Sequence, residues 1–416
     1  MPHPSHHAKG RAPAGGIRRF VTILAATHGV EHILSGSLPP LLLLIREEFG
    51  TGYAELGLLG TVRSMTSGLL QAPAGSLVDR LGSRRILTAG FLLVTVALAV
   101  AGSAPAYGVL VLAQALSGLG SSAFHPATYS MISRVARGEG VGKRMALHTF
   151  GGFLGAAVSF VLVGSLAQLF GWRGALWLLC IPGMLAGLVF WRGFEDISAD
   201  GSRAHGTDGE AADGPRGALL CILRAISTLG GMFGRGFTVF LPLFLSVAYG
   251  MSVAGAGMYS SLAVGAGCVA LLLGGELADR FRRTRVVASF SVASALVVAV
   301  LAHAQLGAVT LLAVLLLLGF FRYAPNPAQS ALISQLGGAG SQGRLFGLTF
   351  SGSFLGGAVA SLAVGWVADL WGMRWAFSCL GLLALARGLL MLVLERMMGK
   401  TRTGVNLRAE VHRHQL

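Results

Sequence analysis

The stretch GSLVDRLGSRR at Gly75–Arg85 returns as GELADRFRRTR at Gly275–Arg285, so that Asp79 and Asp279 lie 200 residues apart in a chain of 416 residues. Two further segments, AFHPATYSMIS at 123–133 and APNPAQSALIS at 324–334, correspond at an offset of 201 residues, and the same offset relates FGGFLGAAVS at 150–159 to SGSFLGGAVA at 351–360. A register kept over such lengths indicates that the chain contains two copies of one half.

The composition of the chain indicates a membrane protein. Hydrophobic residues make up 54% of the chain and charged residues only 12%, which is too few charges to cover the surface of a soluble domain. Apolar stretches of about 20 residues, the length that crosses a hydrocarbon core, recur six times in each copy. The twelve predicted spans are 20–45, 54–77, 86–103, 108–133, 145–168, 174–192, 217–247, 255–277, 286–304, 309–335, 345–369 and 375–397.

These spans predict an all-α membrane protein with twelve transmembrane helices in two six-helix bundles related by pseudo-twofold symmetry. Parallel repeats of this size are typical of a transporter whose halves surround a site near the membrane midplane. The predicted organisation is a tail (1–19), an N-terminal bundle (20–192), a polar linker (193–216), a C-terminal bundle (217–397) and a second tail (398–416). We expect a monomer in the lipid bilayer.

The placement of the basic residues predicts the orientation of the chain. Of 32 Lys and Arg, 24 lie in the two tails and in every second loop, whereas Arg46, Arg173 and Arg374 lie on the opposite side. By the positive-inside rule both termini are cytoplasmic, in a multi-pass protein of the cell's inner (plasma) membrane. The net charge of +15 is therefore explained by topology, and no nucleic-acid partner is expected.

The sequence favours no cofactor, metal or enzyme site. The four cysteines lie in apolar spans without metal-type spacing, and His3, His6 and His7 belong to a solvated tail. The phosphate-binding pattern GxxxxGK[ST] is absent, so uphill movement of a substrate would have to use an ion gradient.

The repeated loop resembles the signature of the major facilitator superfamily, and this resemblance implies that superfamily's fold. It also implies that the loop is a gate, in which a carboxylate beside several Arg closes the cytoplasmic side by pairing with a neighbouring helix. The residues at matching places are Gly75, Asp79, Arg80, Gly82, Arg84 and Arg85 in the first copy and Gly275, Asp279, Arg280 and Arg285 in the second, where Arg282 replaces the glycine.

A narrower resemblance lies in the first half. GLGSSAFHPA at 118–127 and SGLLQAP at 67–73 are similar to segments of the fosmidomycin-resistance group of drug exporters. This resemblance implies efflux as an antiporter and a role in antibiotic resistance. Antiporters of the superfamily often have a Gly-Pro step in the fifth span, where this chain has Val158, Ser159 and Phe160. Two alternatives to export therefore stay open: proton-linked uptake of a small organic anion, and a membrane receptor or assembly factor that transports nothing.

Four ionisable residues lie within spans 1, 4, 7 and 10, which line the central cavity of the superfamily. They are Glu31, His125, Arg235 and Arg322. Ionisable groups are costly in lipid and indicate functional sites. Two permanently charged Arg against one acid predict a positive cavity, and the planar guanidinium suits carboxylate, phosphate or phosphonate. We expect a small, anionic or drug-like substrate, with Glu31 and His125 as candidate proton carriers.

Each of these residues also has a purely structural interpretation. Glu31 could pair with one of the two Arg and hold the halves together, the Arg could bind backbone carbonyls freed by prolines, and His125 could stabilise the kink at Pro126. His148 is expected to face the membrane interface rather than a ligand. Arg63 and Arg387 have no acidic neighbour in the sequence, and the roles of Arg63, Arg224 and Arg387 are left unassigned.

Overall fold

A computed structural model describes residues 14–135, 141–194, 215–336 and 342–413, and these residues form helices and connecting turns without a strand. Most of the predicted linker and the tail residues His3, His6 and His7 lie outside the described residues. The all-helical prediction is confirmed for the part of the chain that the structure describes.

The N-terminal half begins with a broken first span. Helix α1 (Ala14–Ser35) is followed by the short 3-10 helix η1 (Pro39–Leu41) and by α2 (Leu42–Phe49). The remaining spans of this half are α3 (Tyr53–Leu81), α4 (Ser83–Gly102), α5 (Tyr107–Ser121) with α6 (Phe124–Val135), and α7 (Val141–Gly193). Helix α7 holds two spans, because Gly171 has a left-handed φ of 71° that divides it.

The C-terminal half repeats this order. Its helices are α8 (Pro215–Tyr249), α9 (Val253–Arg280), α10 (Arg283–His303), α11 (Ala308–Tyr323) with α12 (Pro325–Leu336), α13 (Gln342–Trp371) and α14 (Met373–Arg413). The fourth and tenth spans are thus both broken at their middle, before Pro126 and Pro325, since proline cannot donate the hydrogen bond that continues a helix.

Nine helical segments within the described ranges are long and apolar enough to cross a membrane by length and composition. One of them, Lys143–Gly193, contains two of the predicted spans. The first two predicted spans are not among the nine, and they contain the ionisable residues Glu31 and Arg63. The nine segments therefore correspond to ten of the twelve predicted spans, and the helices α1 (with η1 and α2) and α3 overlap the other two.

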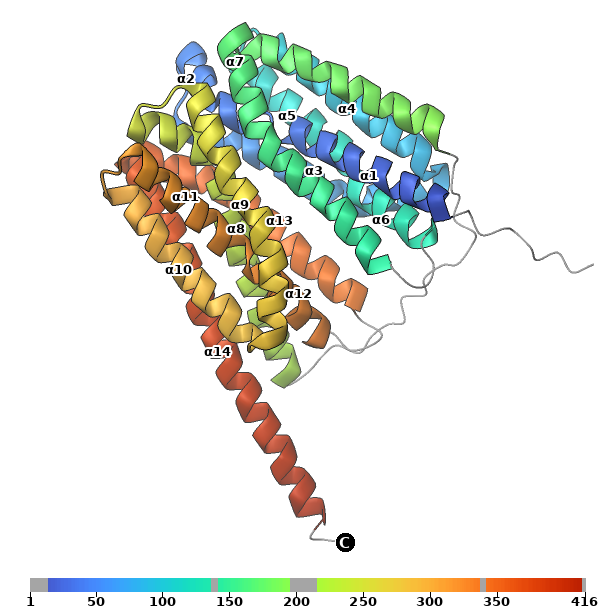
Figure 1. The fold of residues 1–416 in the computed structure, drawn as a ribbon, viewed down its shortest axis with the longest axis vertical. Helices are drawn as coiled ribbons and strands as arrows, with labels where there is room; N and C mark the ends of the chain where they lie inside the picture. Colours follow the sequence, from blue (N-terminus) through green and yellow to red (C-terminus); the bar gives the residue numbers. More distant parts are fainter. Residues whose placement is uncertain (1–13, 136–140, 195–214, 337–341, 414–416) are drawn as a thin grey trace, which may run out of the picture.

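The two bundles contact each other at the end opposite the basic loops and diverge toward the end where α6 and α12 lie (Figure 1). Glycines permit the close contact, because a methyl group on Gly57 of α3 would collide with the carbonyl of Ser361 on α13. The repeat-related pair is Gly257 of α9 against the carbonyl of Phe160 on α7. We call these two helix contacts, α3–α13 and α7–α9, the seams.

A carboxylate bridges α13 and α3 at the end of their seam that lies opposite the basic loops. The Oδ1 and Oδ2 atoms of Asp369 on α13 accept hydrogen bonds from the backbone N–H groups of Tyr53 (2.7 Å) and Ala54 (2.8 Å). These N–H groups belong to the first turn of α3, so they have no acceptor inside their own helix. The dipole of α3 also favours a negative charge at this end. Asp369 therefore joins the two bundles through the N-terminus of α3.

Asp369→Ala should loosen this end of the molecule. Loss of a helix cap costs about 1 kcal/mol, which changes the population of an open seam roughly fivefold. The measurement is the rate at which a maleimide labels Thr61→Cys, in a chain without its four native cysteines, because Thr61 is buried in the same seam and donates to the carbonyl of Ala358 (2.6 Å).

The matched control is Glu55→Ala. Glu55 caps the same helix end by accepting from the N–H of Gly52 (2.7 Å), but it does so within one bundle. If labelling rose equally in both variants, Asp369 would act only as a cap of α3 and not as a contact between the bundles.

Candidate functional site

A cavity of about 430 Å³ lies between the bundles, on the basic side of the seams. The C-terminal half supplies most of its wall through α8, α11, α12, α13 and α14, and the N-terminal half contributes His32, Phe153 and Ala156. Its polar wall residues are Arg235, Arg322, Arg387, Gln329, Asn326, Ser227, Ser330, Thr238, Thr349, Ser353, Tyr323 and His32. Such a mixture of polar and aromatic groups is typical of a small-molecule site.

Three arginines from three different helices line this cavity: Arg235 on α8, Arg322 on α11 and Arg387 on α14. No described carboxylate lies within 4.0 Å of any of the three guanidinium groups. Arg322 instead lies over the ring of Tyr323, with 4.1 Å between the guanidinium carbon and the ring centre. The cavity wall is therefore strongly positive, since unpaired charges in low dielectric are screened little.

Arg387 was left unassigned from the sequence, and the structure places it in this wall with an exposed fraction of 5%. Its Nη2 donates to the side-chain oxygen of Gln329, whose amide nitrogen donates to the hydroxyl of Ser227 (2.8 Å). This chain of hydrogen bonds fixes the direction of the guanidinium. The sequence did mark Arg387 as unusual, because it is a cation inside a predicted span. It did not indicate that Arg387 lies beside α8.

Neither Arg235 nor Arg322 follows the structural interpretation. Within the described ranges, neither side chain donates a hydrogen bond to a backbone carbonyl, although Pro242 lies inside α8 and Pro325 begins α12. Instead, Gly234 leaves room for Arg322, because a methyl group there would lie 2.5 Å from its Nη2. Both guanidinium groups thus remain available to a ligand in the cavity.

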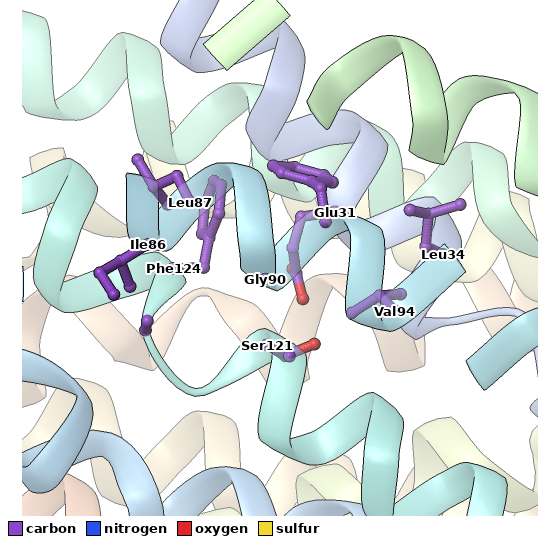
Figure 2. A pocket seen from close by; sticks show the side chains of 11 residues that line it. Glu31, Leu34, Ile86, Leu87, Gly90, Val94, Ser121 and Phe124 are labelled. Carbon is purple, nitrogen blue, oxygen red and sulfur yellow. The ribbon is translucent and has the colours of Figure 1, made fainter. Parts of the chain in front are cut away.

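Glu31 lies outside the wall of the large cavity. It lines a separate pocket of about 10 Å³, which is at the lower limit for one water molecule, and its side chain points toward Ser121 (Figure 2). Its Oε1 lies 3.8 Å from Nη2 of Arg63, and Arg63 also donates to the hydroxyls of Ser117 (3.3 Å) and Ser121 (3.1 Å). Arg63 therefore has an acidic partner that the sequence did not reveal.

This pairing overturns one interpretation of Glu31. Because α1 and α3 belong to the same half, the ion pair between Glu31 and Arg63 does not hold the two halves together. The Oε2 atom of Glu31 lies 4.0 Å from Nε2 of His32, whose ring lines the large cavity. His32 is thus the side chain that links Glu31 to the cavity.

His125 lies at the start of α6, with its ring centre 5.3 Å from that of His28 and 6.4 Å from that of His32. Its Nδ1 is buried and has no hydrogen-bond partner among the described residues, so this atom does not stabilise the kink at Pro126. The expectation for His148 was wrong: its side chain is fully buried, and its ring stacks on His28 at 4.2 Å. Sequence spacing could not place four histidines from three helices together.

The repeated loops lie at the basic end, where the helices α3 and α9 finish. Asp79, Arg80, Asp279 and Arg280 are exposed, and Arg84 lies over the ring of Trp191 at 4.9 Å. In the second copy, Arg280 pairs with Glu276, and Arg282 and Arg285 both lie 3.2 Å from Glu395. These ion pairs lie within the C-terminal half, so their gating role stays a prediction. A side-chain carbon added at Gly75 would lie at ordinary contact distance from Pro126.

Comparison with known proteins decides the family. The sequence model of the Major Facilitator Superfamily matches residues 24–349 and 220–411. The chain belongs to the Major Facilitator Superfamily. It is therefore an integral membrane protein of a transporter family and not an enzyme, and the transporter class is the one that the sequence repeats predicted.

Several transporters and resistance proteins are similar in sequence. The fosmidomycin resistance protein of Escherichia coli is 24% identical over 368 residues, covering 84% of this chain and 90% of that protein. The probable L-galactonate transporter of the same organism is 23% identical over 60% of this chain, and the match spans only 59% of that relative. The multidrug efflux pump LfrA of Mycolicibacterium smegmatis is 32% identical, over 38% of this chain.

Solved structures of superfamily members share the fold. A bacterial homologue of the human lysosomal transporter Spinster, in an inward-facing and occupied conformation, superposes with a TM-score of 0.81 at 15% identity, covering 93% of this chain and 98% of that one. The nucleoside transporter NupG superposes with a TM-score of 0.79 at 14% identity, covering 91% and 99%. At these identities the likeness establishes the major facilitator fold, with its twelve helices in two bundles.

Proposed function

We propose that this superfamily member is a secondary active transporter that exports a small anionic compound from the cytoplasm by alternating access, driven by protons. The observation that carries the proposal is the group of Arg235, Arg322 and Arg387 in one cavity, without a carboxylate partner within the described residues. Guanidinium groups bind carboxylate, phosphate and phosphonate through paired hydrogen bonds. The relatives named for fosmidomycin resistance and multidrug efflux support export.

The closed seams support alternating access. The bundles touch at the end opposite the basic loops, and the cavity lies on the basic side, which the positive-inside rule predicts to face the cytoplasm. This arrangement corresponds to an inward-facing state of a protein in the inner membrane. The substrate would enter there, and rocking of the bundles would close the repeated loops and open the seams.

Accumulation of one labelled anion, measured in vesicles of the two opposite orientations, tests the direction of transport. We expect everted vesicles, whose interior corresponds to the outside of the cell, to accumulate the anion when their lumen is acidic. Accumulation in right-side-out vesicles only, driven by external acid, would replace export by uptake, for which the same cavity would serve. No accumulation of any phosphonate or small carboxylate in either orientation would favour a receptor and overturn the proposal.

Expression in a hypersensitive bacterium gives an independent test. The proposed export should raise tolerance to at least one phosphonate or other anionic antibiotic, and the variant Arg322→Ala, produced at the same level, should not. Unchanged tolerance across a broad anionic panel would remove drug export from the proposal.

Glu31→Gln should abolish pH-driven transport while the folded protein stays in the membrane. Glutamine keeps the shape of Glu31, but it can neither take up nor release a proton. It also lacks the negative charge that lies 3.8 Å from the guanidinium of Arg63. The measurements are proton-driven accumulation, expected to fall at least tenfold, and substrate exchange without a gradient, expected to persist. Glu47→Gln, at an exposed position of α2, is the control. Full pH-driven activity in Glu31→Gln would place proton coupling elsewhere.

A further inference from the structure

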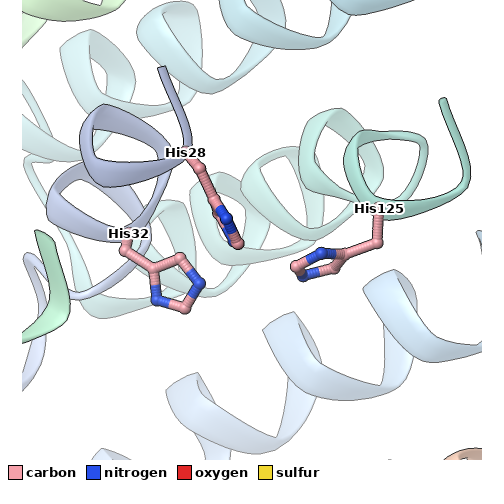
Figure 3. Close-up of side chains that lie close together, drawn as sticks. All are labelled: His28, His32 and His125. Atoms are coloured by element: carbon pink, nitrogen blue, oxygen red, sulfur yellow. The ribbon is translucent and has the colours of Figure 1, made fainter. Parts of the chain in front are cut away.

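Three histidines from two helices of the N-terminal bundle converge on one point. His28 and His32 lie four residues apart, and so on one face of α1, while His125 extends from the start of α6 toward them (Figure 3). One ring nitrogen from each histidine lies within 4.8 Å of the corresponding atoms of the other two. The proposed anion site does not explain this cluster, because only His32 lines the arginine cavity.

The surroundings of His28 orient its ring as they would a metal ligand. Its Nδ1 lies 2.8 Å from the backbone carbonyl of His148, so the ring must donate its proton there, and Nε2 keeps a lone pair. A hydrogen bond from the second ring nitrogen to a backbone carbonyl is the usual support of a metal-binding histidine. His148 is itself fixed, since its Nδ1 lies 3.2 Å from the carbonyl of Leu24.

Two of the nitrogens in the cluster lack a partner. Nε2 of His28 and Nδ1 of His125 are buried and have no hydrogen-bond partner among the described residues. His28 has an exposed fraction of only 3%, so water cannot readily take the place of a partner. A buried polar atom without a partner is destabilising, because it has lost its hydrogen bonds to water. The cost would be removed by a ligand that accepts lone pairs, and a metal cation is such a ligand.

We propose that His28, His32 and His125 form a binding site for a divalent transition metal ion such as Zn²⁺. Imidazole nitrogen favours Zn²⁺, Ni²⁺, Cu²⁺ and Co²⁺ over Mg²⁺ and Ca²⁺. Tetrahedral zinc with bonds of about 2.0–2.1 Å needs nitrogens roughly 3.3 Å apart, so the rings must approach by about 1 Å or more. His32 can make this movement, because 33% of its side chain is exposed toward the cavity.

The charge of the surroundings is compatible with a cation. The carboxylate of Glu31 lies 4.0 Å from Nε2 of His32 and supplies a negative charge beside the cluster, which offsets the nearby Arg63. Three nitrogens leave one coordination position of a tetrahedral ion for water or for a small anion. Because His32 borders the large cavity, an ion could enter the site from that side.

Metal binding to the purified, full-length protein tests the site. The parent protein should carry no polyhistidine purification tag, and His3, His6 and His7 should be replaced by asparagine so that the N-terminal tail binds no metal. We expect one equivalent of Zn²⁺ to bind and to raise the melting temperature, and one equivalent of Co²⁺ to give the visible absorption of a four-coordinate ion. Neither measurement needs a transported substrate, so failure of the proposed transport function would leave the result unaffected.

Single variants decide which histidines bind the ion. His32→Gln and His125→Gln should each weaken Zn²⁺ binding at least tenfold and remove the Co²⁺ absorption, while His303→Gln should bind as the parent does. His303 is a suitable control because it is exposed and bonds only to Ser378 (2.8 Å) among the described residues, in the other bundle. Since His32 is partly exposed, its variant should keep the melting temperature of the metal-free parent, which separates loss of a ligand from loss of the fold.

Two results would overturn the proposal. One is the absence of Zn²⁺ binding to the folded parent at millimolar concentration. The other is equal Zn²⁺ affinity in the parent and in a chain in which His28, His32 and His125 are all glutamine.

Discussion

Gly257→Trp should abolish transport and trap the protein with its seams open. Gly257 packs directly against the backbone carbonyl of Phe160, where even a methyl group would collide, and the indole would force α9 away from α7. Because the contact joins two backbones, no rotation of a side chain can relieve the collision. We expect transport to fall more than tenfold and the maleimide labelling of Thr61→Cys, from the side opposite the basic loops, to rise by a similar factor.

Gly265→Trp is the matched control on the same helix. An added side-chain atom at Gly265 has no neighbour within 4 Å, so the same substitution two turns away leaves the seam intact. This variant should keep at least half of the transport rate. Equal loss of transport in both variants would mean that tryptophan perturbs α9 in general. Normal transport in Gly257→Trp would show that the seam does not need to close.

Arg235→Lys and Arg322→Lys should each weaken binding of the transported anion by about tenfold, and the corresponding alanine variants by roughly 100-fold. A charge-assisted hydrogen bond contributes about 1.5–3 kcal/mol, which corresponds to roughly 10- to 150-fold in affinity. Lysine keeps the charge but loses the planar fork that binds two oxygens at once. Both side chains line the cavity and have no carboxylate partner in the described ranges, so their full binding capacity is available.

Thermal-shift titration with phosphonates and small carboxylates, followed by calorimetry on the best ligand, would measure these losses. Arg173→Lys is the control, because Arg173 pairs with Glu48 (2.7 Å) at the far end of the molecule, outside the cavity. Affinity equal to that of the parent in both cavity variants would remove the anion from the proposed function. Loss of affinity in Arg173→Lys would indicate that the substitutions act through stability.

The membrane class, the helix count and the twofold repeat were predictable because each depends on local or periodic properties of the chain. A span needs about 20 apolar residues wherever it lies, and a duplication keeps its register independently of folding. The same local reasoning selected Arg235 and Arg322, since a cation inside a span is conspicuous in sequence. The cavity between the bundles contains both.

Partners within the membrane were not predictable, because they depend on how helices distant in sequence are rotated against each other. Glu31 was expected among the cavity residues, yet its carboxylate contacts Arg63 in a small pocket beside His32. His148 was expected at the interface and is buried against His28. A rotation of one helix by one residue, about 100°, would change every such contact and leave the pattern of spans unaltered.

The sequence by itself determined that this chain crosses the membrane as two related halves, and it predicted a positively charged cavity between them. The length of the apolar stretches, the repeat and the charges within the spans can all be read directly from the sequence. Only the tertiary structure decided which charges meet, that Arg387 joins Arg235 and Arg322, and that three histidines converge. The physical reason is that lipid specifies where a helix must be apolar but not which neighbour its polar face contacts. That choice is made by packing, through close contacts such as Gly57 on Ser361.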